Sequence, residues 1–429
     1  MCDSVPARSS PGKSFGRVRL GLILVVVVAA AIRLAYVVTL DRARLYWADE
    51  VIYDEIGWQL AETGHFQSTT YWAPPVLPTF LAIVYRVFGH DYRAARICQA
   101  LLGAVLVLAM FWLADVFFGR KTAYLTALGI AFYPPFIYLS GVFYAEHTYM
   151  LLMAVTLCSL AQWQQQRRAL WLVVAGILMG LTALCRPVFL AFFPFAAAYV
   201  WWRAPRKTKL RCSLSVCVVA VATIAPWTLR NAVVFKQFVL ISTGVGRHLW
   251  RGNNDLSLGD ADDRNLIPLN PLGLDEVSED RRLETEALRW LRAHPGKFLA
   301  LSGQRLLTLY SAFTKTITKA EVVNQRRVVV AVLSFYPVLA LGFVGMALAP
   351  YRNKASLLLH GVIGANLLTY LPMTACTRFR LPIDAYWIAF AAFALVVMGD
   401  RLTHAFFGAQ TSSANHRRSA FPDQVTDVG

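Results

Sequence analysis

Residues 20–31 of the chain read LGLILVVVVAAA, and apolar character continues past Arg33 to Leu40. A helix of this length crosses the roughly 30 Å of hydrocarbon in a bilayer. Arg17 and Arg19 precede the stretch, as basic residues precede the apolar part of a signal peptide. The stretch is longer than such a part, and we expect it to be retained as the first membrane span.

The composition extends this conclusion to the whole chain. Hydrophobic residues make up 57% of the 429 residues and charged residues 16%, so a water-soluble fold would be left with apolar surface that it cannot cover. The sequence therefore predicts an all-α polytopic membrane protein with about ten transmembrane helices. The apolar stretches lie at 20–40, 95–118, 121–140, 145–163, 169–184, 187–202, 212–229, 327–349, 355–372 and 380–399.

Lysine and arginine collect in alternate short loops, which predicts that both ends of the chain are cytoplasmic. The net charge of +17 is then a topology signal and a match to anionic lipid headgroups, and no nucleic-acid motif accompanies it. We expect the polar tails to be disordered and 298–316 to lie along the membrane rather than cross it. The predicted regions are a cytoplasmic tail 1–18, a transmembrane core 19–229 with an external acidic loop 41–94, an external helical segment 230–326, C-terminal transmembrane helices 327–400 and a cytoplasmic tail 401–429.

The acidic loop carries the segment 46–66, YWADEVIYDEIGWQLAETGHF, directly after the first span. Its carboxylates are Asp49, Glu50, Asp54, Glu55 and Glu62. A juxtamembrane pair such as Asp49 and Glu50 is suited to accepting a proton from a nucleophile or to binding a cation. The same pattern is typical of an interfacial helix anchored by Trp and Tyr, and the segment alone does not distinguish the two.

Metal and redox chemistry are not indicated elsewhere. The seven cysteines show neither metal-ligand spacing nor a disulfide framework and are interpreted as packing residues. The histidines His65, His90, His147 and His248 also lack short ligand spacing. We expect no cofactor, although a divalent ion beside Asp49 and Glu50 stays open.

Four arginines fall at the predicted outer ends of spans, where the charge rule disfavours cations: Arg186, Arg230, Arg378 and Arg380. A guanidinium costs about 3 kcal/mol at mid-membrane, so these residues need an anionic partner. The partner is either the acidic set Asp49, Glu50 and Glu146 or a lipid-linked phosphate, which suits the forked guanidinium. Snorkelling to the interface is the alternative, and the one favoured for Arg33.

Several segments resemble a known family in order and spacing. They are ADEVIYDEIGWQL, APPVLPTFLAIVYRVFG, RICQALLGA, YAEHTYMLLMA, CRP, APWTLRNAVVFKQFVLISTGVGRHLWRGNND and TRFRLPI, over about 33–390. The chain resembles bacterial glycosyltransferase family 39-like proteins, relatives of the protein O-mannosyltransferases and of the lipid A aminoarabinose transferase. Here Tyr71-Trp72-Ala73 precede Pro74 and Pro75, where the family commonly has a basic residue, and this departure bears on the substrate class.

The resemblance implies a GT-C fold with an active site at the external face of the inner membrane. It implies that Asp49 is the catalytic base and that Glu50 assists it. The other implied roles are donor-phosphate binding by Arg186, Arg230, Arg378 and Arg380, lining of the cavity by Tyr53 and Glu146, and the start of an outer loop over the site at Gly252, Asn253 and Asn254, which equally fit a simple turn.

The implied activity is transfer of a hexosyl or pentosyl group from a polyprenyl-phosphate donor to a hydroxyl of a glycan, lipid or protein acceptor. Membrane lipids are the other expected partners. A transporter or flippase of a lipid-linked sugar is the main alternative, although the chain shows no inverted repeat. A polymerase or ligase of lipid-linked glycans is a third possibility, which need not place a base directly after the first span.

Overall fold

The computed structural model describes residues 15–66, 73–259, 272–312 and 325–418, and its elements are helices throughout these ranges. The first half comprises α1 (Phe15–Val38), α2 (Ala48–Thr63), α3 (Val76–Phe88), α4 (Tyr92–Phe118), α5 (Arg120–Phe132), α6 (Pro134–Tyr138), η1 (Leu139–Gly141), α7 (Glu146–Gln166), α8 (Ala169–Cys185), η2 (Pro187–Phe192) and α9 (Phe193–Arg203). The second half comprises α10 (Lys209–Phe235), α11 (Val245–Gly252), α12 (Glu276–Ala293), α13 (Pro295–Leu309), α14 (Gln325–Arg352), η4 (Lys354–Ser356), α15 (Leu357–Tyr370) and α16 (Thr377–Arg418).

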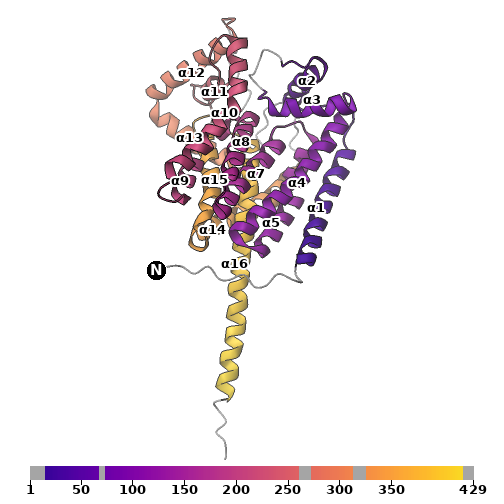
Figure 1. Cartoon of the computed structure of the whole chain (residues 1–429), viewed down its shortest axis with the longest axis vertical. Coiled ribbons are helices and arrows are strands. Elements are labelled where there is room, and N and C mark those ends of the chain that lie inside the picture. The colour runs from indigo at the N-terminus through magenta and orange to yellow at the C-terminus, as the bar shows by residue number, and fades with distance from the viewer. Residues whose placement is uncertain (1–14, 67–72, 260–271, 313–324, 419–429) are drawn as a thin grey trace, which may run out of the picture.

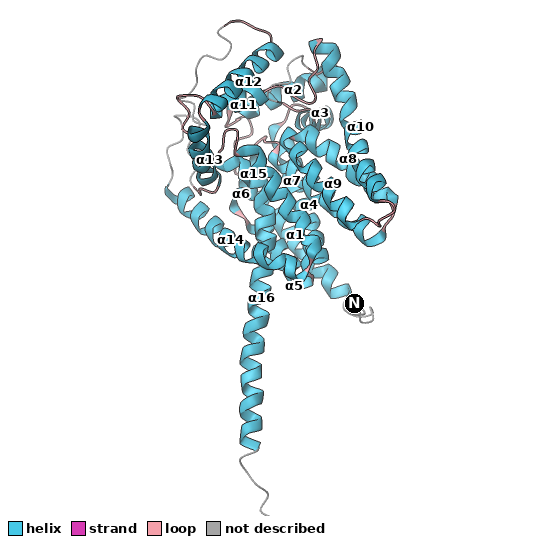
Figure 2. Cartoon of the chain, turned by 90° about the vertical axis from the view of Figure 1, so that its left-hand side faces the viewer, coloured by secondary structure: helices cyan, strands magenta, loops and turns pink. Residues whose placement is uncertain are grey.

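The helices form one elongated bundle. Helix α4 packs against α1, α5 and α7, while α8 packs between α7 and α10, and α16 packs against α5 and α14. Helices α2, α3, α11 and α12 gather at one end of the bundle, which we call the α2 end (Figure 1). The last part of α16 extends from the opposite end as a single helix, as the view turned by 90° also shows (Figure 2).

Five helices of the described chain are long and apolar enough to cross a membrane, and a sixth span results if the bent pair α5–α6 counts as one. The five are Leu20–Val38, Tyr92–Phe118, Lys209–Phe235, Val328–Arg352 and Thr377–Thr403. All ten apolar stretches predicted from the sequence are helical, the shorter ones including α7, α8 and α15. The predicted all-α, multi-pass membrane fold is therefore confirmed.

The break between α5 and α6 explains why an arginine lies inside the bundle. Pro134 and Pro135 have no N–H, so the carbonyls of Ile130 and Ala131 lose their helical donors. The guanidinium of Arg33 in α1 replaces those donors, with Nη2 2.9 Å from the Ile130 oxygen and Nη1 3.1 Å from the Ala131 oxygen. Arg33 is fully buried. The expectation that Arg33 snorkels is wrong, because its charge completes the hydrogen bonding of a broken helix.

Helix α2 is fixed to its neighbours through a second buried polar group. The Asp54 carboxylate accepts hydrogen bonds from Tyr85 Oη at 2.6 Å, His90 Nε2 at 2.8 Å and Tyr92 Oη at 3.1 Å. These donors come from α3, from the short connection after it and from the start of α4. Asp54 therefore orients α2, and with it the residues of its first turn.

The chain ends differ from the expected disordered tails. Helix α1 begins at Phe15, and α16 continues to Arg418, past the predicted boundary at 400. No proline follows Pro382 in this helix, so the backbone has no break that would stop it earlier. Some predicted regions lie partly outside the described residues: 1–14 and 419–429 of the tails, 67–72 of the acidic loop, and 260–271 and 313–324 of the external segment, the last including the end of the predicted 298–316 stretch.

Candidate active site

Four helix ends meet at the α2 end of the bundle, and each contributes a charged side chain. Asp49 lies in the first turn of α2, Glu146 is the first residue of α7, Arg186 directly follows α8, and Arg378 is the second residue of α16. The positive end of a helix dipole favours carboxylates at the starts of α2 and α7. The same effect disfavours Arg378 at the start of α16, so that cation depends on the carboxylates around it.

The four side chains form a continuous chain of ion pairs. Asp49 Oδ2 lies 2.5 Å from Arg378 Nη1, Arg378 Nε lies 2.5 Å from Glu146 Oε1, and Arg186 Nη1 lies 2.5 Å from the same Glu146 oxygen. The exposed fraction of the side chain rises from 0% at Glu146 through 15% at Arg186 and 20% at Arg378 to 26% at Asp49. Glu146, within the chain of charges, is thus dry, whereas the Asp49 end is reached by solvent, and the four charges together are neutral.

Aromatic side chains hold the two arginines in place. The guanidinium carbon of Arg378 lies 3.6 Å from the centre of the Tyr144 ring, and that of Arg186 lies 5.6 Å from the centre of the Phe379 ring. Tyr53 is buried one helical turn after Asp49, and burial raises the pKa of its hydroxyl, although Arg378 and Arg186 oppose the rise. Tyr53 therefore remains a protonated hydrogen-bond donor beside the charges.

Glu50 does not join this chain, although it is the neighbour of Asp49. Its carboxylate is fully buried and accepts backbone N–H groups from Tyr46 at 2.7 Å, Trp47 at 3.1 Å and Phe143 at 2.8 Å. Burial raises the pKa of Glu50, and these hydrogen bonds, together with the charge of Arg96, oppose the rise. The contacts show Glu50 capping α2 and joining it to the segment before α7.

Two of the four predicted phosphate-binding arginines also lie apart from the chain. Arg380 is buried and paired with Asp384 one helical turn later, at 2.9 Å, and its guanidinium stacks on Phe335. Arg230 stacks on Trp227 and donates to Asn231 at 3.1 Å, both on its own helix α10. Of the predicted set, the structure brings Arg186 and Arg378 together with Glu146 and Asp49.

The predicted outer loop begins as a tightly held turn. Asn253 is fully buried, and its side-chain amide donates to the carbonyls of Leu249 at 2.7 Å and Pro372 at 2.8 Å. The buried Arg305 of α13 donates to Asn253 Oδ1 at 2.9 Å and to the Leu371 carbonyl at 2.8 Å. The residues between α15 and α16, which lead to Arg378, are thus bound to α11 and α13.

Asn254 and Gly252 belong to the same turn. The Asn254 side chain accepts from the Leu256 N–H at 2.8 Å and donates to the Trp250 carbonyl at 2.9 Å. A Cβ at Gly252 would come within 2.6 Å of the Met373 carbonyl oxygen, so this close approach requires glycine. The contacts of these two residues stabilise the turn.

His248 of α11 lies at the edge of the site. Its Nδ1 is 3.5 Å from Thr374 Oγ1, three residues before the start of α16. Burial lowers the pKa of His248 to about 4, and the charges of Arg251 and Arg186 act in the same direction while Asp49 opposes them. The ring is therefore neutral near pH 7.

The sequence analysis did not identify Tyr144, His248 and Arg305 as contributors to this region. Tyr144 carries a signal, since it stands two residues before Glu146 in the quoted YAEH segment. His248 and Arg305 reach the region through the fold alone, from helices far apart in the chain. Such contacts have no signal in a single sequence.

A metal site does not emerge from the described residues, which contain no group of three or more His, Cys, Asp or Glu side chains placed to hold an ion. The pair proposed for a divalent ion, Asp49 and Glu50, is divided between an arginine and backbone N–H groups. These two carboxylates therefore do not fit a shared metal ligand set.

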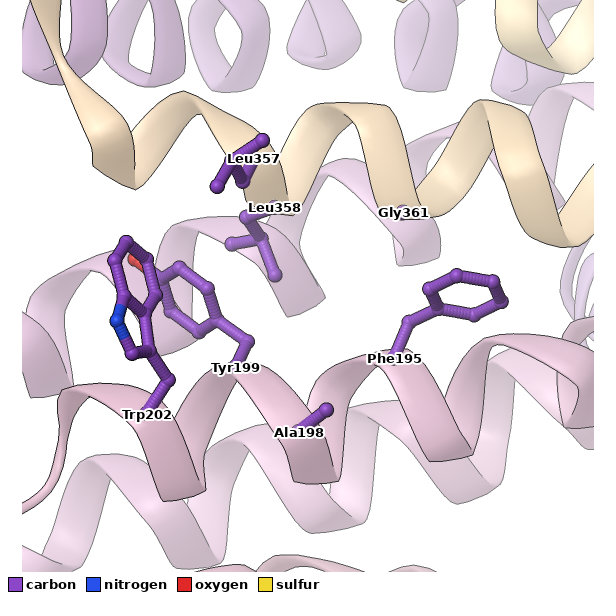
Figure 3. Close-up of a pocket in the computed structure, with 7 residues that line it drawn as sticks. All are labelled: Phe195, Ala198, Tyr199, Trp202, Leu357, Leu358 and Gly361. Atoms are coloured by element: carbon purple, nitrogen blue, oxygen red, sulfur yellow. The ribbon is translucent and has the colours of Figure 1, made fainter. Parts of the chain in front are cut away.

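An apolar cavity of about 200 Å³ lies between α9 and α15, away from the charged residues (Figure 3). It is lined by Phe195, Ala198, Tyr199, Trp202, Leu357, Leu358 and Gly361. None of the predicted site residues contributes to it. Its surface suits hydrocarbon, and it offers no group for acid–base chemistry.

The comparisons with known proteins agree with this architecture. Residues 73–229 match the family described as dolichyl-phosphate-mannose-protein mannosyltransferase. No curated protein matches the chain by sequence. The apo oligosaccharyltransferase of Archaeoglobus fulgidus is similar in structure, with a TM-score of 0.59 and 16% identity over 93% of this chain and 52% of that one.

Two further solved structures are similar. The Archaeoglobus fulgidus oligosaccharyltransferase AglB, in complex with an inhibitory peptide and a dolichol-phosphate, has a TM-score of 0.54 and 18% identity over 92% of this chain and 52% of that one. ArnT from Cupriavidus metallidurans, bound to undecaprenyl phosphate, has a TM-score of 0.45 and 17% identity over 92% of this chain and 80% of that one.

The chain spans about half the length of the archaeal oligosaccharyltransferases that it matches. The two archaeal matches nevertheless cover nearly all of the present chain, and they show that its helices have the GT-C arrangement. The chain is a multi-pass membrane protein with the GT-C fold. The resemblance predicted from the sequence is confirmed at the level of the fold.

Proposed function

We propose that this protein is a glycosyltransferase that moves a sugar from a polyprenyl-phosphate donor to an acceptor hydroxyl at the external face of the membrane. The observation that carries the proposal is the ion-pair chain Asp49–Arg378–Glu146–Arg186. It places a partly exposed carboxylate beside two guanidinium groups, which is the minimum that this reaction requires. The GT-C fold and the match to a mannosyltransferase family over 73–229 support the same class of reaction.

The chemistry assigns one task to each side of the chain. Asp49 accepts the proton of the acceptor hydroxyl, the hydroxyl oxygen forms a bond to the anomeric carbon, and the bond from that carbon to the phosphate oxygen breaks. The polyprenyl phosphate leaves with the electron pair, and Arg186 and Arg378 stabilise its growing negative charge. The leaving group is ionised already, so no general acid is needed. Attack opposite the leaving phosphate inverts the anomeric configuration.

The other predicted residues receive different tasks in this proposal. Glu146 is the buried counter-ion that holds both arginines, and Tyr53 offers its hydroxyl as a hydrogen-bond donor beside them. Glu50 positions the first turn of α2 through its three backbone contacts. Arg380 and Arg230 are left out of the phosphate site, because Asp384 and Trp227 are their observed partners.

The test is a reconstituted reaction. Purified full-length protein, a polyprenyl-phosphate sugar and candidate acceptors should release polyprenyl phosphate only when an acceptor is present. Asp49→Asn should lower this rate by about 10²–10⁴, the usual contribution of a general base. The matched control is Glu55→Gln, an exposed carboxylate on the same helix, which should be nearly silent. Movement of intact lipid across the membrane without release would instead establish the transporter.

The proposed side of the membrane is tested separately. A cysteine introduced at the exposed Leu258, which follows the turn at Asn253 and Asn254, should react with an impermeant reagent from outside the cell membrane. Labelling only after permeabilisation would place the α2 end of the bundle in the cytoplasm and contradict the proposed external site.

A further inference from the structure

Arg378 is bound to two carboxylates in different environments. Its Nε is paired with Glu146, which is fully buried, and its Nη1 is paired with Asp49, which is about a quarter exposed. The face of the guanidinium rests on Tyr144 at 3.6 Å. The buried contact and the aromatic ring therefore fix the group, while the contact to Asp49 lies on the side that a substrate reaches.

The contact to Asp49 conflicts with the task of a base. While Nη1 of Arg378 donates to Oδ2 of Asp49, that position on the oxygen is taken and is closed to an acceptor hydroxyl. The same guanidinium edge is what a phosphate oxygen would occupy. In the structure, Asp49, the proposed base, is thus paired with Arg378, the residue proposed to bind the phosphate.

The net charge of the site changes when the donor binds, and this change favours release of Asp49 from Arg378. Asp49 and Glu146 balance Arg186 and Arg378, so the site is neutral as it stands. An arriving donor, which is a phosphodiester with one negative charge, makes the site negative by one. The phosphate then competes with Asp49 for the guanidinium, and when Asp49 takes the proton of the acceptor its negative charge passes to the departing polyprenyl phosphate, beside the two arginines.

We propose, on the basis of the proposed function, that Asp49 and the donor phosphate compete for Nη1 of Arg378, so that donor binding releases Asp49 to act as the base. Glu146 keeps hold of Nε throughout, and the guanidinium changes partner without leaving its place. In the empty site Oδ2 of Asp49 is therefore held by Arg378, and the donor binds before that oxygen takes the proton of the acceptor. After polyprenyl phosphate leaves, the return of Arg378 to Asp49 favours loss of the proton and restores the starting state.

The buried side of the site supports Glu146 as the constant partner. Its Oε1 accepts from both arginines, and its Oε2 is buried with no hydrogen-bond partner among the described residues. A charge held in this way has no access to solvent and no alternative cation. Replacement of Glu146 by phosphate would leave its carboxylate buried and unpaired, which costs far more than release of Asp49.

The experiment measures equilibrium binding of undecaprenyl phosphate to the full-length protein in nanodiscs, without any acceptor. Asp49→Asn should tighten binding about three- to tenfold, because the phosphate no longer displaces a partly exposed ion pair. The gain should vanish in an Arg378→Gln background and persist in an Arg186→Gln background, where Arg378 is still present. Glu55→Gln, on the exposed face of the same helix, should leave binding unchanged.

Each result decides the matter. Unchanged or weaker binding by Asp49→Asn overturns the competition, while the proposed function stands if the lipid phosphate still binds. Equal tightening with and without Arg378 also overturns it, since Asp49 would then repel phosphate through space. Absence of binding in the wild-type protein overturns the proposed function itself. Melting curves of the variants, compared with the wild type, confirm that the purified proteins are folded.

Discussion

The substitution Glu50→Gln best distinguishes the roles of Asp49 and Glu50, the two adjacent carboxylates of α2. The Glu50 carboxylate accepts three backbone N–H groups, and a glutamine has one oxygen to offer. In its best orientation that oxygen faces Tyr46 and Trp47, which leaves the amide nitrogen opposed to the Phe143 N–H. The loss of one charge-assisted hydrogen bond costs about 1.5–3 kcal/mol, and the two that remain become neutral and weaker.

The loss of stability is partly offset, because the uncharged glutamine avoids the desolvation penalty of a buried carboxylate, which is the penalty that raises the pKa of Glu50. We therefore expect a net loss of about 2–4 kcal/mol of stability near pH 7. Asp49→Asn removes one partly exposed contact and should cost about 1 kcal/mol or less. The same pair should show the opposite order in catalysis, where Asp49→Asn is the more damaging change.

Thermal unfolding in detergent, followed by tryptophan fluorescence, measures the first comparison, and the reconstituted transfer reaction measures the second. Glu55→Gln is the control for loss of a carboxylate on α2, because Glu55 is exposed. A Glu50→Gln protein that melts with the wild type would refute the capping role derived from the three contacts. An Asp49→Asn protein that melts several degrees lower would show that Asp49 is structural too.

Three further changes test the remaining roles. Arg186→Gln should weaken use of the donor about ten- to hundredfold in donor titrations, whereas Arg230→Gln, at a side chain stacked on Trp227, should change it less than about threefold. His248→Gln should change the transfer rate by the same factor at every pH from about 5.5 to 8, because a His248 pKa of about 4 keeps the ring neutral over this range. A ratio of variant to wild-type rate that changes near pH 6.5 would show that His248 has an ordinary pKa. Gly103→Ala places a Cβ 2.5 Å from Nε2 of the His147 ring and should lower the melting temperature with an unchanged donor KM.

The fold was open to prediction because membrane spans depend on local composition. Each predicted apolar stretch is helical, since a segment in hydrocarbon satisfies its backbone groups only within itself. The interior arginine was missed for a long-range reason. Two acceptors of Arg33, the carbonyls of Ile130 and Ala131, lie about a hundred residues away at a break caused by two prolines, and only the fold brings them together.

The sequence indicated that carboxylates and arginines gather near the start of α2, but not which of the arginines lie together. Arg378 and Arg380 are two residues apart in α16, so they point about 200° apart around the helix and do not serve one ligand. The sequence analysis grouped them because it did not place the start of that helix. Asp384, four residues after Arg380, was a readable sign of a separate pair.

Glu50 shows the same limit at the start of α2. Once Ala48 is known as the first helical residue, Glu50 stands at the third position, where a glutamate side chain reaches back to the backbone before the helix. Without that boundary, Asp49 and Glu50 appear equivalent. Adjacent residues point about 100° apart around a helix, so Asp49 faces the arginines and Glu50 faces the backbone before the helix.

The buried contact of Arg33 also constrains how the protein is made. Helix α1 leaves the ribosome long before α5, so Arg33 enters the membrane without the carbonyls of Ile130 and Ala131 that later bind it. An arginine at the centre of a nascent span opposes insertion by about 2.5–3.5 kcal/mol, and one nearer the end, such as Arg33, opposes it by less. The run of valines and alanines before Arg33 favours insertion. We therefore expect α1 to integrate securely only after Ile130 and Ala131 have been synthesised. In a chain truncated before Pro134, α1 is expected to slip from the bilayer more readily than in a chain that extends beyond α6.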